Sequence, residues 1–214
     1  MKKLIKFSAL TKFMAVASAV IAVVGIVMLL IFSGETTPEF TFVNLGWGLV
    51  LRTLVATVLT VALTTAYLLI CYGKKGFKMG LTSALGAVIS AVCAFAFCVI
   101  CRAPLSDFTF PVMLLGVFVS YISSVIFFRS FGTDKPKGKQ FSVDVAFETA
   151  ANKAFVPLLI MLLLITLVAV GAFAVALFLK SSALCLYVLP VILTAIFSVL
   201  VTLSFTCNIY AKKA

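Results

Sequence analysis

The chain has 214 residues, of which 64% are hydrophobic and only 11% charged, whereas an ordinary soluble domain has roughly 45–50% and about 25%. The mean hydropathy of +1.30 extends over the whole length and leaves no polar segment long enough for a soluble domain of even about 50 residues. We therefore exclude soluble enzymes and expect an integral membrane protein. Histidine is absent and carboxylates number only six, which removes the commonest general bases and metal ligands.

Six stretches are long and apolar enough to cross a bilayer core of about 30 Å as helices. They are expected near residues 13–32, 48–72, 79–101, 109–128, 154–179 and 183–210. The last is long for one span and contains Pro190, which removes a backbone donor. Pro111 and Pro157 lie near the starts of their spans, where first-turn positions would tolerate the missing N–H. The sequence thus predicts a single all-α membrane domain over residues 1–214, a bundle of six transmembrane helices.

Basic residues are distributed unevenly between the two ends of these spans. The net charge of +11 would suggest nucleic acid in a soluble protein, but here its distribution over the loops is informative, and we expect no nucleic-acid partner. Arg52, Arg102 and Lys180 fall on one side, and all other Lys and Arg residues fall on the other. Because cytoplasmic loops are enriched in Lys and Arg, both termini are predicted to be cytoplasmic in a multi-pass protein of the cell membrane.

Two segments outside the apolar cores need separate interpretation. The N-terminus resembles a secretory signal, but its small residues 15–19 precede the end of the apolar run, so we expect a retained anchor. In the long loop of residues 130–153, Ser142 can cap a helix on which Phe147, Ala150 and Ala154 recur at three- or four-residue spacing. This predicts a juxtamembrane helix leading into the fifth span, with a docking site for a cytoplasmic partner as the alternative.

Few polar side chains inside the spans could carry chemistry. No carboxylate falls within a span, whereas a proton-driven transporter normally places carboxylates there. Arg52 is the one charge inside a span, about one turn below its end. We favour an interfacial anchor, alone or paired with Glu35 or Glu39, over a gating role.

The second span carries four threonines spaced by four, three and four residues, which we call the threonine face: Thr53, Thr57, Thr60 and Thr64. At this spacing their hydroxyls share one side of a helix. We favour a packing seam in which each hydroxyl bonds the carbonyl one turn back. The alternative is a polar groove.

Small residues and cysteines gather in the third span and near the outer ends. Gly80 and Ala84, Gly86 and Ser90, and Ala87 and Ala91 are each four apart, which places the third span at the centre of the bundle.

Most of the six cysteines are expected to be apolar filler. Cys98 and Cys101 have the spacing of a redox or metal pair but lie in an apolar helix, so no metal is expected. A disulfide between Cys101 and Cys185 requires the third and sixth spans to be neighbours.

Three segments, in this order, carry a family resemblance. Ile70-Cys-Tyr-Gly-Lys-Lys-Gly-Phe77 precedes Gly80 and Ala84-Leu-Gly-Ala-Val-Ile89. The fourth span ends in Ser124-Val-Ile-Phe-Phe-Arg129, and Ser142-Val-Asp-Val-Ala-Phe-Glu-Thr-Ala-Ala-Asn-Lys153 leads into a long apolar helix. Together they resemble SecF, the smaller membrane subunit of the SecD/SecF protein-export accessory complex, which has a membrane domain of the resistance-nodulation-division type. The resemblance covers most of the chain.

The sequence departs from that family where its acidic residues stand. The family's His-Asp in the third helix corresponds to Ala91 and Val92, its Asn-Asp in the fourth to Tyr121 and Ile122, and its Asp before the arginine to Phe128. These differences remove the groups to which the family's proton coupling is assigned. The loop between the first two spans is also too short to form the family's extracytoplasmic domain.

The resemblance therefore implies half of a pseudo-symmetric membrane bundle. Such a subunit would support protein export or translocation by binding a SecD-like protein and the Sec translocon, without a cofactor and without being proton-coupled itself. Arg52, Arg129 and Lys153 are the candidate partner-contact residues. The alternatives are a small homo-oligomeric transporter or channel whose pathway the threonine face lines, and a structural scaffold subunit of a membrane complex. An enzyme is not expected, because no catalytic constellation is present.

Overall fold

The computed structural model describes residues 7–32, 47–106, 108–132 and 143–206, and within them it has six long α-helices and no strand. The helices are α1 (Phe7–Phe32), α2 (Trp47–Tyr72), α3 (Lys74–Ile100), α4 (Thr109–Gly132), α5 (Val143–Phe178) and α6 (Ser182–Val201), followed by a short π-helical turn, η1 (Thr202–Thr206). All six helices are long and apolar enough to cross a membrane. The predicted all-α six-helix membrane bundle is therefore confirmed.

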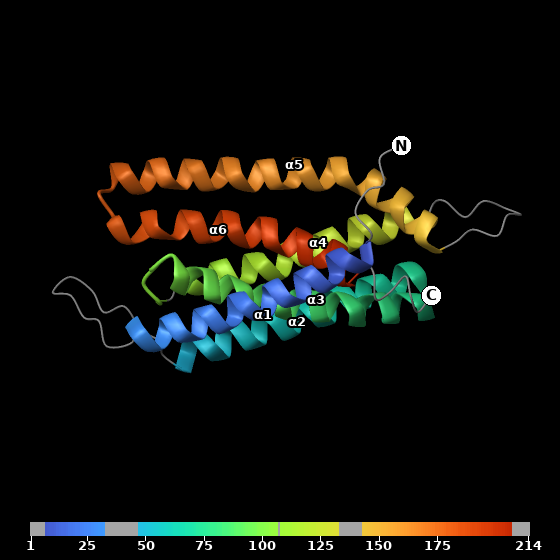
Figure 1. Ribbon diagram of the computed structural model, residues 1–214, viewed down its shortest axis with the longest axis horizontal. Helices are drawn as coiled ribbons and strands as arrows, with labels where there is room; N and C mark the ends of the chain where they lie inside the picture. Colours follow the sequence, from blue (N-terminus) through green and yellow to red (C-terminus); the bar gives the residue numbers. More distant parts are fainter. Residues whose placement is uncertain (1–6, 33–46, 107, 133–142, 207–214) are drawn as a thin grey trace, which may run out of the picture.

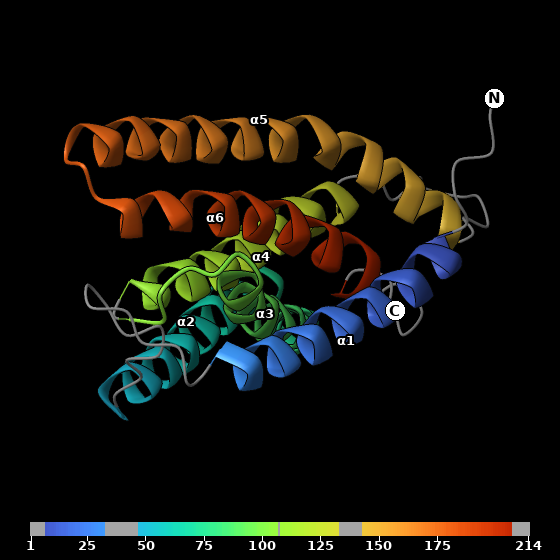
Figure 2. The ribbon, with the colours of Figure 1, turned by 60° about the vertical axis from the view of Figure 1, so that its left-hand side comes forward.

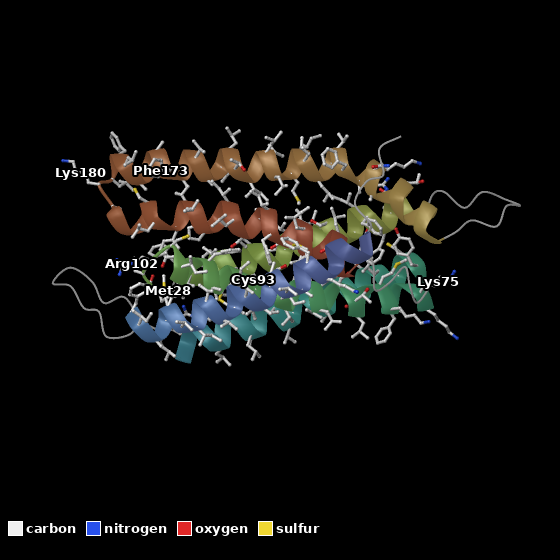
Figure 3. The ribbon with its side chains drawn as sticks, in the orientation of Figure 1. Met28, Lys75, Cys93, Arg102, Phe173 and Lys180 are labelled. Carbon is white, nitrogen blue, oxygen red and sulfur yellow. The ribbon has the colours of Figure 1, made fainter. Side chains whose placement is uncertain are left out.

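The six helices run along one long axis, and α1 begins at the same end of the bundle at which η1 ends (Figures 1 and 2). α3 contacts α1, α2, α4 and α6, while α4 contacts α2, α3, α5 and α6. α5 and α6 lie on one side of this pair and α1 and α2 on the other (Figure 1). We call the end that carries Lys75 the basic end; Arg102 and Lys180 lie at the opposite end (Figure 3).

Small residues bring α3 close to its neighbours, as its sequence predicted. A methyl group on Gly80 would lie 2.7 Å from the Thr65 side chain of α2, and one on Gly25 of α1 would lie 2.6 Å from the Ala96 Cβ. About three-fifths (61%) of the most apolar stretch of α3 is buried, against 6–11% for α1, α2 and α5. The central position of this helix follows from residues that let helix backbones approach.

A single glycine turns the chain between α2 and α3. Gly73 has φ of +59° and ψ of −140°, a conformation that side chains disfavour, and its amide donates to the Leu69 carbonyl at 2.8 Å. One turn later, a methyl group on Gly76 would clash with the Leu68 carbonyl oxygen. The segment Ile70 to Phe77, which carries part of the family resemblance, is thus a tight helical corner that needs both glycines.

Two helix starts differ from the expected spans. α3 begins at Lys74 rather than near residue 79, and α5 begins at Val143 and continues without interruption into the fifth span. The predicted juxtamembrane helix is confirmed, whereas its proposed cap, Ser142, lies outside the described residues. The expectation that Pro157 is a first-turn residue is wrong, because α5 starts well before it. Pro157 cannot donate to the Lys153 carbonyl one turn earlier, and α5 is bent in its first half (Figures 1 and 2).

The sixth span is shorter as an α-helix than expected. α6 ends at Val201 and passes into η1, and residues 207–210 of the predicted span lie outside the described part of the chain. Pro190 lies inside α6, while Pro111 occupies the first turn of α4, as predicted. At the start of α6, the Ser181 hydroxyl accepts from the Leu184 amide at 3.5 Å.

α3 and α5 end in the same way, each at a basic residue. Arg102 (φ +56°) and Lys180 (φ +53°) are left-handed. Their amides donate to the Val99 and Leu177 carbonyls, and the next residues donate to Cys98 and Ala176. This pattern is a Schellman motif, with a cation in the place that glycine usually holds. Both cations therefore lie at the negative end of a helix dipole.

Candidate functional site

The buried polar side chains of the described residues are hydroxyls, and they lie on the helices that meet α4. They come from α3, α4, α6 and η1: Ser83, Ser90, Thr109, Ser120, Ser123, Ser124, Thr194, Ser198, Thr202 and Ser204. Every basic side chain that the structure describes is exposed. The membrane-spanning stretches found within the described residues contain no carboxylate. In this part of the chain, the bundle core is therefore polar in places but holds no carboxylate.

Several of these hydroxyls are satisfied by their own helix. Ser83, Ser123 and Ser124 each donate to the carbonyl four residues earlier, at 2.6–2.9 Å. Another contact joins two elements, because Ser120 Oγ of α4 and Thr202 Oγ1 of η1 lie 2.9 Å apart. Thr202 also donates to the Ser198 carbonyl at 2.8 Å. This pair ties the end of α6 to the middle of α4.

Three hydroxyls near the middle of the core have no partner among the described residues: Ser90, Thr194 and Ser198. A methyl group on Gly116 of α4 would lie 3.1 Å from both the Ser90 carbonyl oxygen and Thr194 Cγ2. Gly116 thus lets α3, α4 and α6 meet at one point. Sequence reasoning did not identify this hydroxyl cluster, although Thr194, Ser198 and Thr202 have the four-residue spacing that revealed the threonine face.

Two hydroxyls of the threonine face are bonded within their own helix. Thr60 donates to the Ala56 carbonyl at 2.7 Å, and Thr64 donates to the Thr60 carbonyl at 2.8 Å. Thr57 is half-buried, and the side chain of Thr53 lies outside the described set. Both hydroxyls therefore bond the carbonyl one turn back, as the favoured interpretation expects of them, while the role of the face in packing stays a prediction.

Two grooves open on the sides of the bundle. One lies between α2 and α4, has a volume of about 330 Å³, and is lined among others by Leu63, Thr64 and Tyr67 of α2 and by Phe118, Ile122 and Val125 of α4. The other, of about 320 Å³, lies between α1 and α3 beside Cys93 and Ser18. Thr64 is the member of the threonine face that reaches a groove wall. Both grooves are mainly apolar.

The three candidate basic residues do not form one site. Arg52 is exposed near the start of α2, and its predicted partners Glu35 and Glu39 lie outside the described residues. Arg129 is exposed in the last turn of α4, and Lys153 is exposed on α5. Phe127 and Phe128, which precede Arg129, pack in a buried cluster with Ala150, one turn before Lys153. The structure thus places Arg129 on α4 and Lys153 on α5 at the basic end, and Arg52 near the start of α2.

The positions at which the family resemblance implies polar residues are partly brought together. Ala91 of α3 and Tyr121 of α4 belong to one buried cluster with Ala87 and Val117. The Tyr121 hydroxyl has no partner among the described residues, although the side chain is only 3% exposed. Their neighbours Val92 and Ile122 are exposed on the bundle surface.

The cysteines are free thiols wherever the structure describes them. Cys98 is fully buried and Cys101 half-buried at the end of α3. α3 and α6 are neighbours, which is the condition set for a Cys101–Cys185 disulfide, yet both side chains are unbonded here. Among the described residues, no three His, Cys, Asp or Glu side chains converge as metal ligands would.

Comparisons with protein-family models, curated proteins and solved structures each find no match for this chain.

Proposed function

We propose that the chain is a SecF-like membrane subunit that supports protein export by binding partner membrane proteins and is not itself proton-coupled. The observation that carries this proposal is the meeting of Ala91 and Tyr121 in one buried cluster between α3 and α4. The resemblance aligns these two positions with the polar residues of the family's third and fourth helices. If this chain has the same helix arrangement as the family, these two positions must lie close together between the third and fourth helices.

The chemistry of the core supports a role without proton transfer. A proton-coupled membrane subunit needs a group whose charge changes within the membrane. Serine and threonine hydroxyls do not titrate in the physiological range. In the resemblance, Val92, Ile122 and Phe128 stand where the family has its acidic residues. The subunit would therefore act by packing, in the cell membrane, with both termini in the cytoplasm.

Arg129 and Lys153 are the proposed partner contacts at the basic end. Both are exposed beside the buried cluster of Phe127, Phe128 and Ala150, so their charges are presented on a surface whose underlying helices are fixed. An acidic edge of a SecD-like protein would complement them. Arg52, at the other end of the bundle, would contact the same partner near the opposite membrane face.

Affinity purification from native membranes in a mild detergent tests this proposal. We expect a SecD-like protein or a translocon subunit to co-purify and to be identified by mass spectrometry. The double variant Arg129→Gln and Lys153→Gln should reduce its recovery. Lys180→Gln, which removes one exposed charge at the other end, is the control and should leave recovery unchanged. Purification of the chain with no Sec component would refute the assignment.

The observed hydrogen bonds do not favour the transporter alternative. Thr60 and Thr64 direct their hydroxyls to carbonyls of their own helix, so they are already satisfied before any solute arrives. A transporter would still show substrate-dependent flux in liposomes that is lost when Thr57 and Thr60 become valine. A scaffold subunit would instead co-purify with a membrane complex that lacks Sec proteins.

A further inference from the structure

The groove between α2 and α4 has the dimensions of a site for one lipid chain. Phe118, Ile122, Val125 and Arg129 recur on α4 at spacings of four, three and four, so they lie along one face of the helix. The α4 residues that line the groove, from Phe118 to Ile126, extend about 12 Å along the helix axis, and Arg129 follows one turn after Val125. The groove and this arginine together extend about 16 Å, which is about half of a bilayer core of roughly 30 Å. The groove therefore runs from mid-membrane toward the basic end.

The groove volume favours a chain over a helix. Its volume of about 330 Å³ is at the lower end of the range for small-molecule sites, roughly 300–1,000 Å³. A transmembrane helix is about 10 Å across and would not enter such a groove. Leu63, Phe118 and Ile122 are exposed and apolar, so an alkyl chain in the groove meets a mainly apolar wall.

Positive charge is concentrated where the groove reaches the membrane surface. Arg129 is exposed in the last turn of α4, one turn after Val125, which lines the groove. Lys74, Lys75 and Lys78 are exposed in the first turns of α3, directly after the corner at which α2 ends. A guanidinium binds phosphate oxygens in a bidentate manner, and nearby lysines add attraction for an anionic headgroup.

We propose that the α2/α4 groove binds one acyl chain of an anionic phospholipid, whose phosphate is held by Arg129 with the lysines of the first turns of α3. An apolar groove within one leaflet and exposed cations beyond its surface end together define this ligand. Zwitterionic lipids share the chain but lack the net charge. The site shares Arg129 with the proposed partner contact, but lipid binding in detergent is measured without any partner protein.

Native mass spectrometry of the delipidated protein tests this site. The protein is incubated in non-ionic detergent with equal amounts of dioleoylphosphatidylglycerol and dioleoylphosphatidylcholine. The wild type should retain phosphatidylglycerol over phosphatidylcholine, and Arg129→Gln should lower phosphatidylglycerol retention about tenfold without changing phosphatidylcholine retention. Lys153→Gln removes the same charge from the same end but from α5, away from the groove, and should retain the lipid as the wild type does.

A second variant tests the groove separately from the charge. Ile122→Trp fills the groove with a larger apolar side chain and should also lower phosphatidylglycerol retention. Equal retention of both lipids by the wild type, or wild-type retention by both variants, would overturn the proposal. A dimer that Ile122→Trp converts to monomer with no change in bound lipid would also overturn it and would assign the groove to a second copy. Failure here would leave the co-purification result, and the role in export, untouched.

Discussion

The contact between Gly25 of α1 and Ala96 of α3 offers a quantitative test of how α1 is held. A methyl group on Gly25 would lie 2.6 Å from the Ala96 Cβ and 3.0 Å from its Cα. Carbon atoms in contact prefer about 3.5–4.0 Å, so Gly25→Ala must push the two helices apart by about 1 Å. Neither methyl carbon can rotate away, because each is fixed to its backbone.

The expected energy follows from two opposing effects. Overpacking of this kind costs about 1–3 kcal/mol, while replacing glycine by alanine in a helix returns up to about 1 kcal/mol. We expect Gly25→Ala to lower the free energy of unfolding by about 1–2 kcal/mol. In an Ala96→Gly background the new methyl group takes the space of the one removed, so the same substitution should cost little. The coupling energy should be about 1–2 kcal/mol.

Two measurements check this prediction. Unfolding in sodium dodecyl sulfate, in mixed micelles, gives the free energy for each variant of the double-mutant cycle. Maleimide labelling reports the position of α1, because Cys93 is 1% exposed beneath it and should react faster in Gly25→Ala. Cys71 is exposed and serves as the reference thiol within the same chain.

Gly171 of α5 provides the control for this prediction. A methyl group on Gly171 of α5 would meet no atom within 4 Å, so Gly171→Ala should change stability by no more than about 0.5 kcal/mol. If Gly25→Ala costs the same with and without Ala96→Gly, and Cys93 labelling does not change, then α1 does not cross α3 at this point.

Three further substitutions have expected effects on the free energy of unfolding, measured by the same titration. Tyr121→Phe should be neutral or stabilising by about 1 kcal/mol, because the buried hydroxyl has no partner among the described residues; a clear loss would indicate an undetected acceptor. Tyr187→Phe should destabilise by about 1–2 kcal/mol, because the hydroxyl donates to the Pro104 carbonyl and lies near the hydroxyl of Thr109. Gly73→Ala should cost about 1–3 kcal/mol through its left-handed φ, and no cost would mean that the corner can relax.

The spans could be predicted from the sequence because hydropathy measures what a bilayer core requires. The central position of α3 could also be predicted, because close helix contacts need small residues at four-residue spacing, as at Gly80. The start of α5 could not be predicted in this way. Its first two turns contain Asp144 and Glu148, which lower the hydropathy without opposing a helix. The apolar run therefore identified the membrane-spanning part of α5 but not the start of the helix. For the same reason, the expectation that Pro157 lies in the first turn is wrong.

The buried hydroxyls show a second limit of prediction from the sequence. Serine and threonine spacing along α4 and α6 is visible in the sequence, but the pairing of Ser120 with Thr202 depends on which helices are neighbours. Sequence periodicity gives the face of one helix and carries no information about the helix opposite. The same limit applied to Ala91 and Tyr121, whose contact is known only from the packing of α3 against α4.

The exceptions to the charge asymmetry gain an explanation from the backbone. Arg102 and Lys180 lie at the end with few cations, where the distribution of charge does not favour them. Each occupies the left-handed position after a helix, where an ordinary residue costs about 1–2 kcal/mol relative to glycine. A cation there interacts with the helix dipole, and the Arg102 guanidinium also lies 4.1 Å from the centre of the Phe32 ring at the end of α1. Arg102 and Lys180 therefore stabilise helix ends, and Arg102 also packs against α1. Their positions are explained by these local contacts, so they are compatible with the membrane orientation that the other basic residues predict.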